Sequence, residues 1–502
     1  MKKEILLICP APESCRVKPG GKPVVSRFFR HTRLSLLTVA AATPPDWDVK
    51  IVDEYVSPLE FSSEPTCVGL SFMTAGAPRA YEIAREFRHR GIPVLAGGFH
   101  PTFLPEEALI HCDSVCIGDA EPSWPQILRD LEAGVLKRIY QSDPYASLRG
   151  LGLPRRDLLD PKEYFTRNSV QTSRGCPNHC TFCSITSFYG AHYRHRPVEE
   201  VIEEIAGLSG KLVLFIDDNL VADRSYALKL FSGLKPLNRH WYSQAALTIA
   251  KDSGLLEAAV DSGCKGLFVG LESLSNENLN KVGKGFCLSE NYLRAIETLH
   301  RAGIAVEAGI IFGFDEDGPE VFDRTLDFLK ASRIELAQIT VLTPLPGTVL
   351  YSQMEKESRI LTRDWSYYDF FHVVFQPKKM TPEELQAGTD EVVRRFYKTK
   401  AILERTTSSL HSLGLLQTFG TILPLNLAAK RRVETWEARS TSKSDGLHWL
   451  RSADNFSSEN ARGCERQQST TQDAGITLRA VQKIITGTEV GGINSPIQGG
   501  RA

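Results

Sequence analysis

Three cysteines in the middle of the chain have a spacing that suits a metal cluster. They are Cys176, Cys180 and Cys183, and they follow a stretch predicted to be a strand. Thiolates bind iron–sulfur clusters, and a 4Fe–4S cluster normally takes four of them, one for each iron. Three thiolates on one loop therefore leave the fourth iron open to another ligand. The alternative is a structural zinc site that adds a histidine such as His179, but such sites usually need a second distant pair of ligands, which the sequence lacks.

The pattern C-x3-C-x-aromatic-C, completed by Phe182, resembles the signature of the radical S-adenosylmethionine (SAM) superfamily. The resemblance covers about residues 165–375 and implies an enzyme with a 4Fe–4S cluster on these three cysteines. It also implies that the open iron binds the amino and carboxylate groups of SAM. An electron from the reduced cluster then cleaves the sulfonium bond, which gives methionine and a 5′-deoxyadenosyl radical. Phe182 is expected to lie beside these cofactors.

The same resemblance places further SAM-binding residues. Asp217 and Asp218 end a predicted strand and look like the family segment that binds the SAM amino group. Glu272 resembles the family acid near the ribose and carboxylate, and Gly309 lies in the strand that packs against adenine. Without the resemblance, paired aspartates at a strand end are more often a turn or a helix cap, and a lone Glu or Gly there is usually structural.

The elements that position these residues are alternating strands and helices. Predicted strands at 169–173, 212–217, 241–247, 266–271, 305–312 and 337–342 are separated by helical segments. Six such units predict a partial β/α barrel, short of the eight that close a full one.

An earlier series of strands, at 4–9, 49–53, 68–72, 93–97 and 114–118, also alternates with helices. Short apolar strands of this kind predict a doubly wound parallel sheet, an α/β fold. Such sheets bind ligands at the carboxyl ends of their strands. The candidate ligand-binding residues at those ends are Ser71, Thr74, Gly97, Gly98, His100, Gly118 and Glu121.

The cofactor of this first domain is not expected to be a dinucleotide, because no G-x-G-x-x-G follows the first strand. A doubly wound domain before a radical barrel instead resembles the cobalamin-binding radical SAM enzymes, which implies that these strand-end residues bind cobalamin. The D-x-H-x-x-G motif that supplies a cobalt ligand in other cobalamin proteins is absent. A role for His100 as cobalt ligand is therefore disfavoured, and a contact with the corrin or its nucleotide tail is expected.

The remaining chain divides by composition. We predict a cobalamin-type domain at 1–145, a linker at 146–166, the barrel at 167–375, a helical region at 376–432 and a disordered tail at 433–502. The motif Thr381 to Glu384 predicts a capping box that opens a helix to about Leu403. The apolar segment 413–427 is expected to pack on the barrel rather than touch a membrane or a lipid-like substrate. The loop 11–30 is expected to be a solvated loop rather than a lining between domains.

Composition limits the functional classes. The 502 residues carry a net charge of −1, which gives no broad attraction to nucleic acid or to an anionic membrane. No apolar stretch approaches the roughly 20 residues of a membrane span. The eleven cysteines are odd in number and scattered, and the apolar start is too short for a signal peptide, which favours a reducing cytoplasm.

The predicted function is cobalamin-dependent methyl transfer to a small-molecule or lipid-like substrate. The substrate radical would collect a methyl group from methylcobalamin, and an external donor such as flavodoxin or ferredoxin would reduce the cluster. Radical oxidation or cyclisation without methyl transfer is the alternative within enzymology. A non-catalytic redox sensor or scaffold is the alternative of another class. Methylthiotransferases are disfavoured, because no second cysteine triad precedes the barrel.

Overall fold

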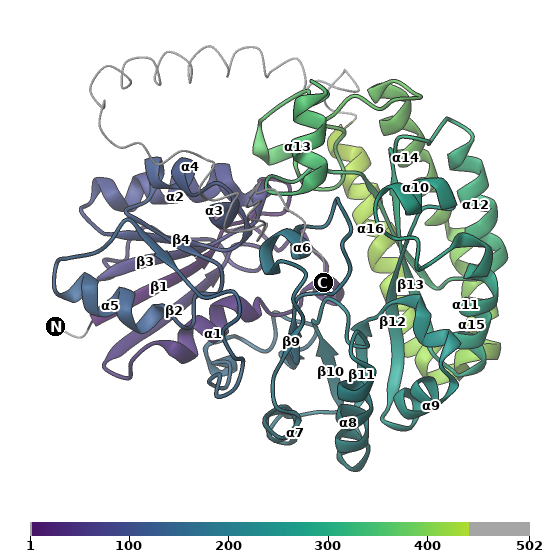
Figure 1. The fold of residues 1–502 in the computed structure, drawn as a ribbon, viewed down its shortest axis with the longest axis horizontal. Helices are drawn as coiled ribbons and strands as arrows, with labels where there is room; N and C mark the ends of the chain where they lie inside the picture. Colours follow the sequence, from purple (N-terminus) through teal and green to yellow (C-terminus); the bar gives the residue numbers. More distant parts are fainter. Residues whose placement is uncertain (1–2, 441–502) are drawn as a thin grey trace, which may run out of the picture. The chain divides into compact units, whose positions relative to one another are not determined.

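A parallel sheet with helices on both faces forms the N-terminal part of the chain (Figure 1). The structure, a computed structural model, describes residues 3–440. The strand order is β2-β1-β3-β4-β5-β6, with β1 (Lys3–Cys9), β2 (Trp47–Asp53), β3 (Cys67–Ser71), β4 (Val94–Gly97), β5 (Ser114–Ile117) and β6 (Ile139–Gln141). The helices of this part are α1 (Leu34–Ala42), α2 (Ala77–His89), α3 (Phe99–Phe103), α4 (Pro105–His111) and α5 (Trp124–Glu132).

Each face of this sheet has its own apolar core. Successive side chains of a strand point to opposite faces, so Leu6 and Ile8 pack with α2 and α4, whereas Ile5 and Leu7 pack with α1 and α5. The chain leaves β1 for β2 on one side, while β3 lies on the other side of β1. The strand order therefore reverses between β1 and β3, the position where doubly wound sheets bind ligands.

A second parallel sheet follows in the order β14-β13-β12-β11-β10-β7, and its two edges do not meet. This confirms the predicted partial barrel. Its strands are β7 (Ser169–Val170), β10 (Leu212–Phe215), β11 (His240–Gln244), β12 (Cys264–Glu272), β13 (Ala305–Phe312) and β14 (Leu336–Val341). Its helices are α7 (Val198–Ala206), α8 (Arg224–Leu234), α9 (Ser253–Asp261), α10 (Asn276–Lys281), α11 (Tyr292–Arg301), α12 (Val321–Ser332) and α13 (Val349–Lys356).

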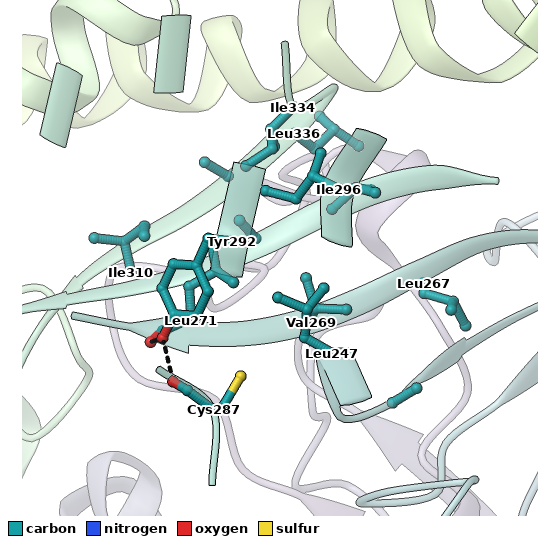
Figure 2. Close-up of a cluster of buried hydrophobic side chains, with 14 of the residues drawn as sticks. Leu247, Leu267, Val269, Leu271, Cys287, Tyr292, Ile296, Ile310, Ile334 and Leu336 are labelled. Carbon is teal, nitrogen blue, oxygen red and sulfur yellow. Dashed lines mark hydrogen bonds between the residues drawn. The ribbon is translucent and has the colours of Figure 1, made fainter. Parts of the chain in front are cut away.

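The barrel core lies between its strands and the helices outside them. Figure 2 shows Val269 and Leu271 of β12 and Ile310 of β13 near Tyr292 of α11. The Tyr292 hydroxyl is 2.8 Å from the carbonyl oxygen of Leu271 and 3.0 Å from that of Cys287. This contact fixes α11 against the carboxyl end of β12.

The first predicted barrel strand, 169–173, is divided in the structure. β7 ends at Val170, and the next residues leave the sheet to form β8 (Ser173–Arg174). β8 pairs antiparallel with β9 (Arg194–His195). The helix α6 (Ser184–Tyr189) lies between the two members of this pair in the sequence. The chain between β8 and α6, residues 175–183, is called the cluster loop below.

The C-terminal region of the described chain is helical. α14 (Pro382–Phe396) begins with the predicted capping box. The helix predicted to reach Leu403 stops at Phe396, because Lys398 takes an extended conformation and starts α15 (Thr399–Gln417). A π-helical turn, η8 (Thr418–Ile422), leads into α16 (Leu423–Ser440), which continues past the predicted boundary at residue 432. The predicted tail beyond residue 440 lies outside the described residues.

Short 3-10 turns complete the described chain: η1 (Arg27–Phe29), η2 (Thr74–Gly76), η3 (Arg156–Leu158), η4 (Lys235–Leu237), η5 (Leu247–Lys251), η6 (Ser289–Asn291) and η7 (Trp365–Tyr367).

The apolar segment 413–427 packs on the barrel only in part. Ile422 and Asn426 are buried, whereas Leu415 and Leu416 are 69% and 93% exposed. By length and composition alone, the helical stretch Thr399–Thr435 is apolar enough to cross a membrane. The stretch is not one straight helix, because Gly414 has φ 76° and ψ 172°.

Candidate functional site

The cluster loop carries the three cysteines in half-buried positions. Cys176, Cys180 and Cys183 are all partly exposed and form no disulfide. Burial raises the pKa of all three thiols. The loop begins at Gly175, where a Cβ atom would lie 1.9 Å from the carbonyl oxygen of His192 and the backbone has φ +89°. Only glycine therefore lets the loop pass this close to the chain that follows α6.

The donor set of this loop fits an iron–sulfur cluster. The Cys176 and Cys183 thiols are near enough to Cys180 to raise its pKa further, after burial, to about 12. A bound metal cation would deprotonate thiols in such a position. Within residues 3–440, no three His, Cys, Asp or Glu side chains are arranged to hold a metal ion. Three thiolates carried on one loop fit a 4Fe–4S cluster, in which each binds a different iron.

Asp217 and Asp218 have different surroundings although they are adjacent. The buried Asp217 carboxylate accepts hydrogen bonds from the hydroxyls of Thr172 (2.7 Å) and Ser173 (2.5 Å). Asp218 accepts one from the backbone N–H of Gly175 (3.1 Å), and burial raises its pKa to about 7. Asp217 therefore holds the strand that precedes the cluster loop, and only Asp218 contacts the loop itself.

Glu272, the last residue of β12, lies beside Gly309 in the neighbouring strand β13. The Glu272 carboxylate is 2.5 Å from the Lys284 ammonium, and both charges act on the thiol of Cys180. A Cβ atom at Gly309 would lie 2.9 Å from the Phe268 ring and 3.6 Å from a Glu272 oxygen. Gly309 thus lets the Phe268 ring pack closely against β13 beside Glu272.

Phe182 packs against this end of the barrel. Its ring meets that of Phe314, just past β13, edge to face with the ring centres 6.1 Å apart. The cysteines, Phe182, Glu272 and Gly309 are thus brought to one end of the barrel sheet. These residues fit SAM, because they combine a charged pair with the donor set of the cluster.

A cavity of about 630 Å³ lies between the strand ends of the N-terminal sheet and the start of the barrel. This volume falls in the range of small-molecule sites. Six of the seven residues predicted for this domain line it: Ser71, Thr74, Gly97, Gly98, Gly118 and Glu121. Residues that the sequence did not indicate line it as well: Gln171, Arg174, Phe188, Tyr189, Leu345 and Tyr368. We call this space the cofactor cavity.

The cofactor cavity extends along one face of the N-terminal sheet. Its lining includes Leu36 of α1, Gly69 of β3 and Trp124 of α5. At the mouth, Gly98 has φ +98°, and a Cβ atom there would lie 2.8 Å from the carbonyl oxygen of Phe72. Glycines at the strand ends and an apolar branch between α1 and α5 fit a large flat ring system with an attached tail, as in cobalamin.

The loop 11–30 and His100 differ from their predictions. Pro12, Ser14 and Val24 of the loop line the cofactor cavity, so the loop is not merely solvated. The His100 ring is fully buried and is absent from this lining. Its Nε2 atom is 3.1 Å from the Tyr81 hydroxyl and 3.3 Å from a Glu107 oxygen. The structure therefore places His100 in a hydrogen-bond network behind the loop.

Buried ion pairs join the two parts of the chain. The Arg174 guanidinium is 2.6 Å from Glu121 and 2.9 Å from Asp119, and Arg194 is 2.8 Å from Asp119. Burial alone raises the pKa of the Glu121 carboxyl, but the charge and hydrogen bonds of Arg174 outweigh it and hold the pKa at about 2. No local pattern indicates this pairing, because its members lie far apart in the chain.

An aromatic contact also bridges the two parts. The Phe188 ring of α6 lies 4.6 Å, centre to centre, from the Phe99 ring of α3. In Figure 1, α6 follows the cluster loop and faces the N-terminal sheet. Both rings line the cofactor cavity, so the helix that follows the cluster loop is held against the strand-end loops at this cavity.

Comparisons with known proteins agree with this arrangement. Residues 170–329 match the model of the radical SAM superfamily, and residues 22–128 match that of the B12 binding domain. Bacteriochlorophyllide d C-12(1)-methyltransferase of Chlorobaculum tepidum is 32% identical over 417 residues, which cover 80% of this chain and 89% of the relative. Hopanoid C-2 methylase of Rhodopseudomonas palustris is 27% identical over 390 residues, with 74% and 72% covered.

Two solved structures share the fold. The radical SAM methyltransferase TsrM from Kitasatospora setae, with cobalamin and a [4Fe-4S] cluster bound, has a TM-score of 0.56 at 17% identity and covers 71% of this chain and 78% of its own. The cobalamin-dependent SAM radical enzyme OxsB, with aqua-cobalamin and SAM bound, has a TM-score of 0.59 at 15% identity, with 97% and 84% covered.

Proposed function

This chain belongs to the radical SAM superfamily, in the group whose members also carry a B12-binding domain, and from that premise we propose that it methylates a large, mostly apolar substrate in the cofactor cavity. It is an enzyme whose cofactors are a 4Fe–4S cluster, SAM and cobalamin. The observation that carries the proposal is the shared cavity. Gly97, Gly98 and Gly118 of the B12-binding part line the same space as Gln171 and Arg174, which precede the cluster loop.

The residues that would hold the cofactors lie in two places: the cluster loop with the adjoining barrel strands, and the strand ends that line the cofactor cavity. Cys176, Cys180 and Cys183 would bind three irons, and Glu272 with Gly309 would border SAM. When bound, these groups supply a carbon radical from SAM and a methyl group from cobalamin. The Glu272–Lys284 pair, with side chains 13% and 12% exposed, offers fixed charges to a polar cofactor. Asp218 and Asp217 position the loop and the strand before it.

The substrate wall of the cavity supports an apolar substrate. Leu345, Tyr368 and Phe370 reach the cavity from the region after β14. Phe370 has φ +72°, an uncommon backbone conformation for an aromatic residue, so the surrounding chain holds its backbone in this conformation. The two relatives named above are called a bacteriochlorophyllide methyltransferase and a hopanoid methylase. We therefore propose a polycyclic or lipid-like small molecule, reached in the cytoplasm with flavodoxin or ferredoxin as electron donor.

The test is product analysis with anaerobically purified protein from cobalamin-fed cells. Candidate tetrapyrroles and hopanoids are incubated with SAM and a reductant, and methylated product, 5′-deoxyadenosine and S-adenosylhomocysteine are measured. Methyl transfer predicts all three. 5′-Deoxyadenosine with a changed but unmethylated product would replace this proposal with radical oxidation or cyclisation.

Matched cysteine variants show whether the chemistry depends on the cluster loop. Cys183→Ala is expected to lose iron and all 5′-deoxyadenosine. Cys67→Ala removes a thiol that is buried in the N-terminal sheet, and it should keep both. Equal iron in the two variants would contradict the assignment of the cluster ligands.

A further inference from the structure

The last described helices form a hairpin whose turn is at Gly414. The Arg405 guanidinium donates a hydrogen bond of 2.7 Å to the side-chain oxygen of Asn426. Residues so far apart in sequence would be separated by about 30 Å along a continuous helix, at 1.5 Å per residue. Ser409 and Asn426 also contact the same residue, Glu335, at the start of β14. The two arms therefore lie side by side against the barrel.

The tip of this hairpin presents apolar side chains to solvent. Leu415, Leu416 and Phe419, called the tip below, are 69%, 93% and 50% exposed. The backbone beneath them is fixed, because Thr418 and Ile422 are buried and the Gln417 amide donates to the carbonyl oxygen of Lys265 (2.5 Å). A contiguous exposed patch of large apolar side chains on a fixed support is typical of an interaction surface.

Basic residues lie at the amino ends of the barrel strands, where Gln417 beside the tip contacts the Lys265 backbone. Burial, together with the charges of Lys265 and Lys211, lowers the pKa of His240, so both lysines lie near it. Within residues 3–440, neither lysine forms an ion pair with an acidic side chain, whereas Lys235 is 2.7 Å from Asp261. The Arg239 guanidinium donates to backbone oxygens of Leu208 and Ile205. The local charge is therefore positive at Lys211, Arg239 and Lys265, although the net charge of the whole chain is −1.

We propose that the protein docks on an anionic lipid bilayer through the tip, with Lys211 and Lys265 contacting lipid headgroups. Apolar side chains flanked by basic residues bind such interfaces by combining apolar burial with attraction to anionic lipid. A second copy of the chain fits less well, because a symmetric contact would bring two sets of the same cations together. The tip is anchored near the start of β12, at the amino ends of the barrel strands. The cluster loop is reached from the carboxyl end of the barrel strand β7, so docking leaves the cofactor cavity open.

Vesicle co-sedimentation with the full-length holoenzyme tests this proposal. Vesicles of phosphatidylcholine alone are compared with vesicles that also contain phosphatidylglycerol, at low and high salt. Binding is expected to the anionic vesicles only, and to weaken as salt rises. The double variant L415S/L416S should lose about tenfold or more in affinity for each leucine removed. Lys211→Ala should lose about fivefold.

Matched controls separate docking from general changes at the surface. Ile110→Ser removes a side chain that is also 69% exposed but lies on α4, and Lys162→Ala removes an exposed lysine of the linker. Both should bind anionic vesicles like the parent protein. Absence of binding to anionic vesicles would overturn the proposal, as would equal losses in Ile110→Ser and L415S/L416S. A parent dimer that L415S/L416S dissociates, without vesicle binding, would assign the tip to a second copy instead.

Discussion

Replacing Glu121 by Gln should destabilise the protein strongly, because it removes one charge from a buried pair. The side chains of Glu121 and Arg174 are 10% and 7% exposed and 2.6 Å apart. Arg174 holds the pKa of Glu121 at about 2, against an ordinary value of 4.5. One pKa unit corresponds to about 1.4 kcal/mol, so the pair contributes about 3 kcal/mol. Arg174 keeps Asp119, 2.9 Å away, as a second partner, so the loss should lie at the lower end of the roughly 3–5 kcal/mol lost when one partner of a buried pair is removed.

The effect of pH follows from the sign of this shift. The pKa of Glu121 is lower in the folded protein than in the unfolded chain, so its contribution is fully present above about pH 4.5. It is lost as the pH falls from there toward about 2. The difference in Tm between the parent protein and Glu121→Gln should therefore be constant near neutral pH and shrink in acid.

Thermal unfolding followed by circular dichroism measures this difference. About 3 kcal/mol corresponds to a Tm lowered by roughly 6–12 °C in a domain of this size. The control is Asp157→Asn, which breaks an arginine–carboxylate pair of 2.8 Å whose side chains are 44% and 60% exposed. Exposed pairs contribute about 1 kcal/mol or less. If Glu121→Gln lowers Tm no more than Asp157→Asn does, the buried pair does not join the two parts as argued.

Two further substitutions test the proposed cobalamin site and the proposed SAM site. Gly98→Ala should lower bound corrin and cost about 1–3 kcal/mol of backbone strain, because its Cβ atom would lie 2.8 Å from the Phe72 carbonyl oxygen. Gly134→Ala is the control, because Gly134 also has positive φ but a Cβ atom there would have nothing within 4 Å, and it should keep its corrin. Equal corrin in both variants would contradict the assignment of Gly98 to the cobalamin site. Glu272→Gln should weaken SAM binding in equilibrium dialysis while corrin content is unchanged, because it leaves the largely buried Lys284 without its partner. Glu277→Gln, 62% exposed in its pair with Lys281, is the control, and unchanged SAM affinity in Glu272→Gln would remove that residue from the SAM site.

The fold could be predicted because its signals are local. Short apolar runs separated by helical periods gave the strands of both sheets, and β13 matches its predicted range from Ala305 to Phe312. β6 was missed, because its three residues are mostly exposed and carry no apolar run. The break in the first barrel strand was also missed, because β8 leaves the sheet for a partner, β9, that the local sequence does not indicate.

The candidate site could be predicted only where one loop carries its own pattern. The cysteine spacing and the strand-end glycines are such patterns. Asp217 and Asp218 could not be separated, because the partners of Asp217 lie 45 and 44 residues away in the sequence. His100 and Glu121 looked alike as polar residues of strand-end loops, but tertiary contacts bury the His100 ring behind the cavity and place Glu121 against Arg174.

One short stretch of chain fixes the cluster loop relative to the strand ends of the N-terminal sheet. Thr172 and Ser173 donate hydrogen bonds to Asp217 of the barrel, Arg174 forms the buried pair with Glu121, and Gly175 donates to Asp218. The first cysteine of the cluster loop follows directly. Each of these four residues is therefore fixed by a partner, with Asp217 serving two of them, and the partners belong to both parts of the molecule. A shift of this strand would move the cluster loop relative to the strand-end glycines, which gives the buried pairs a role in positioning as well as in stability.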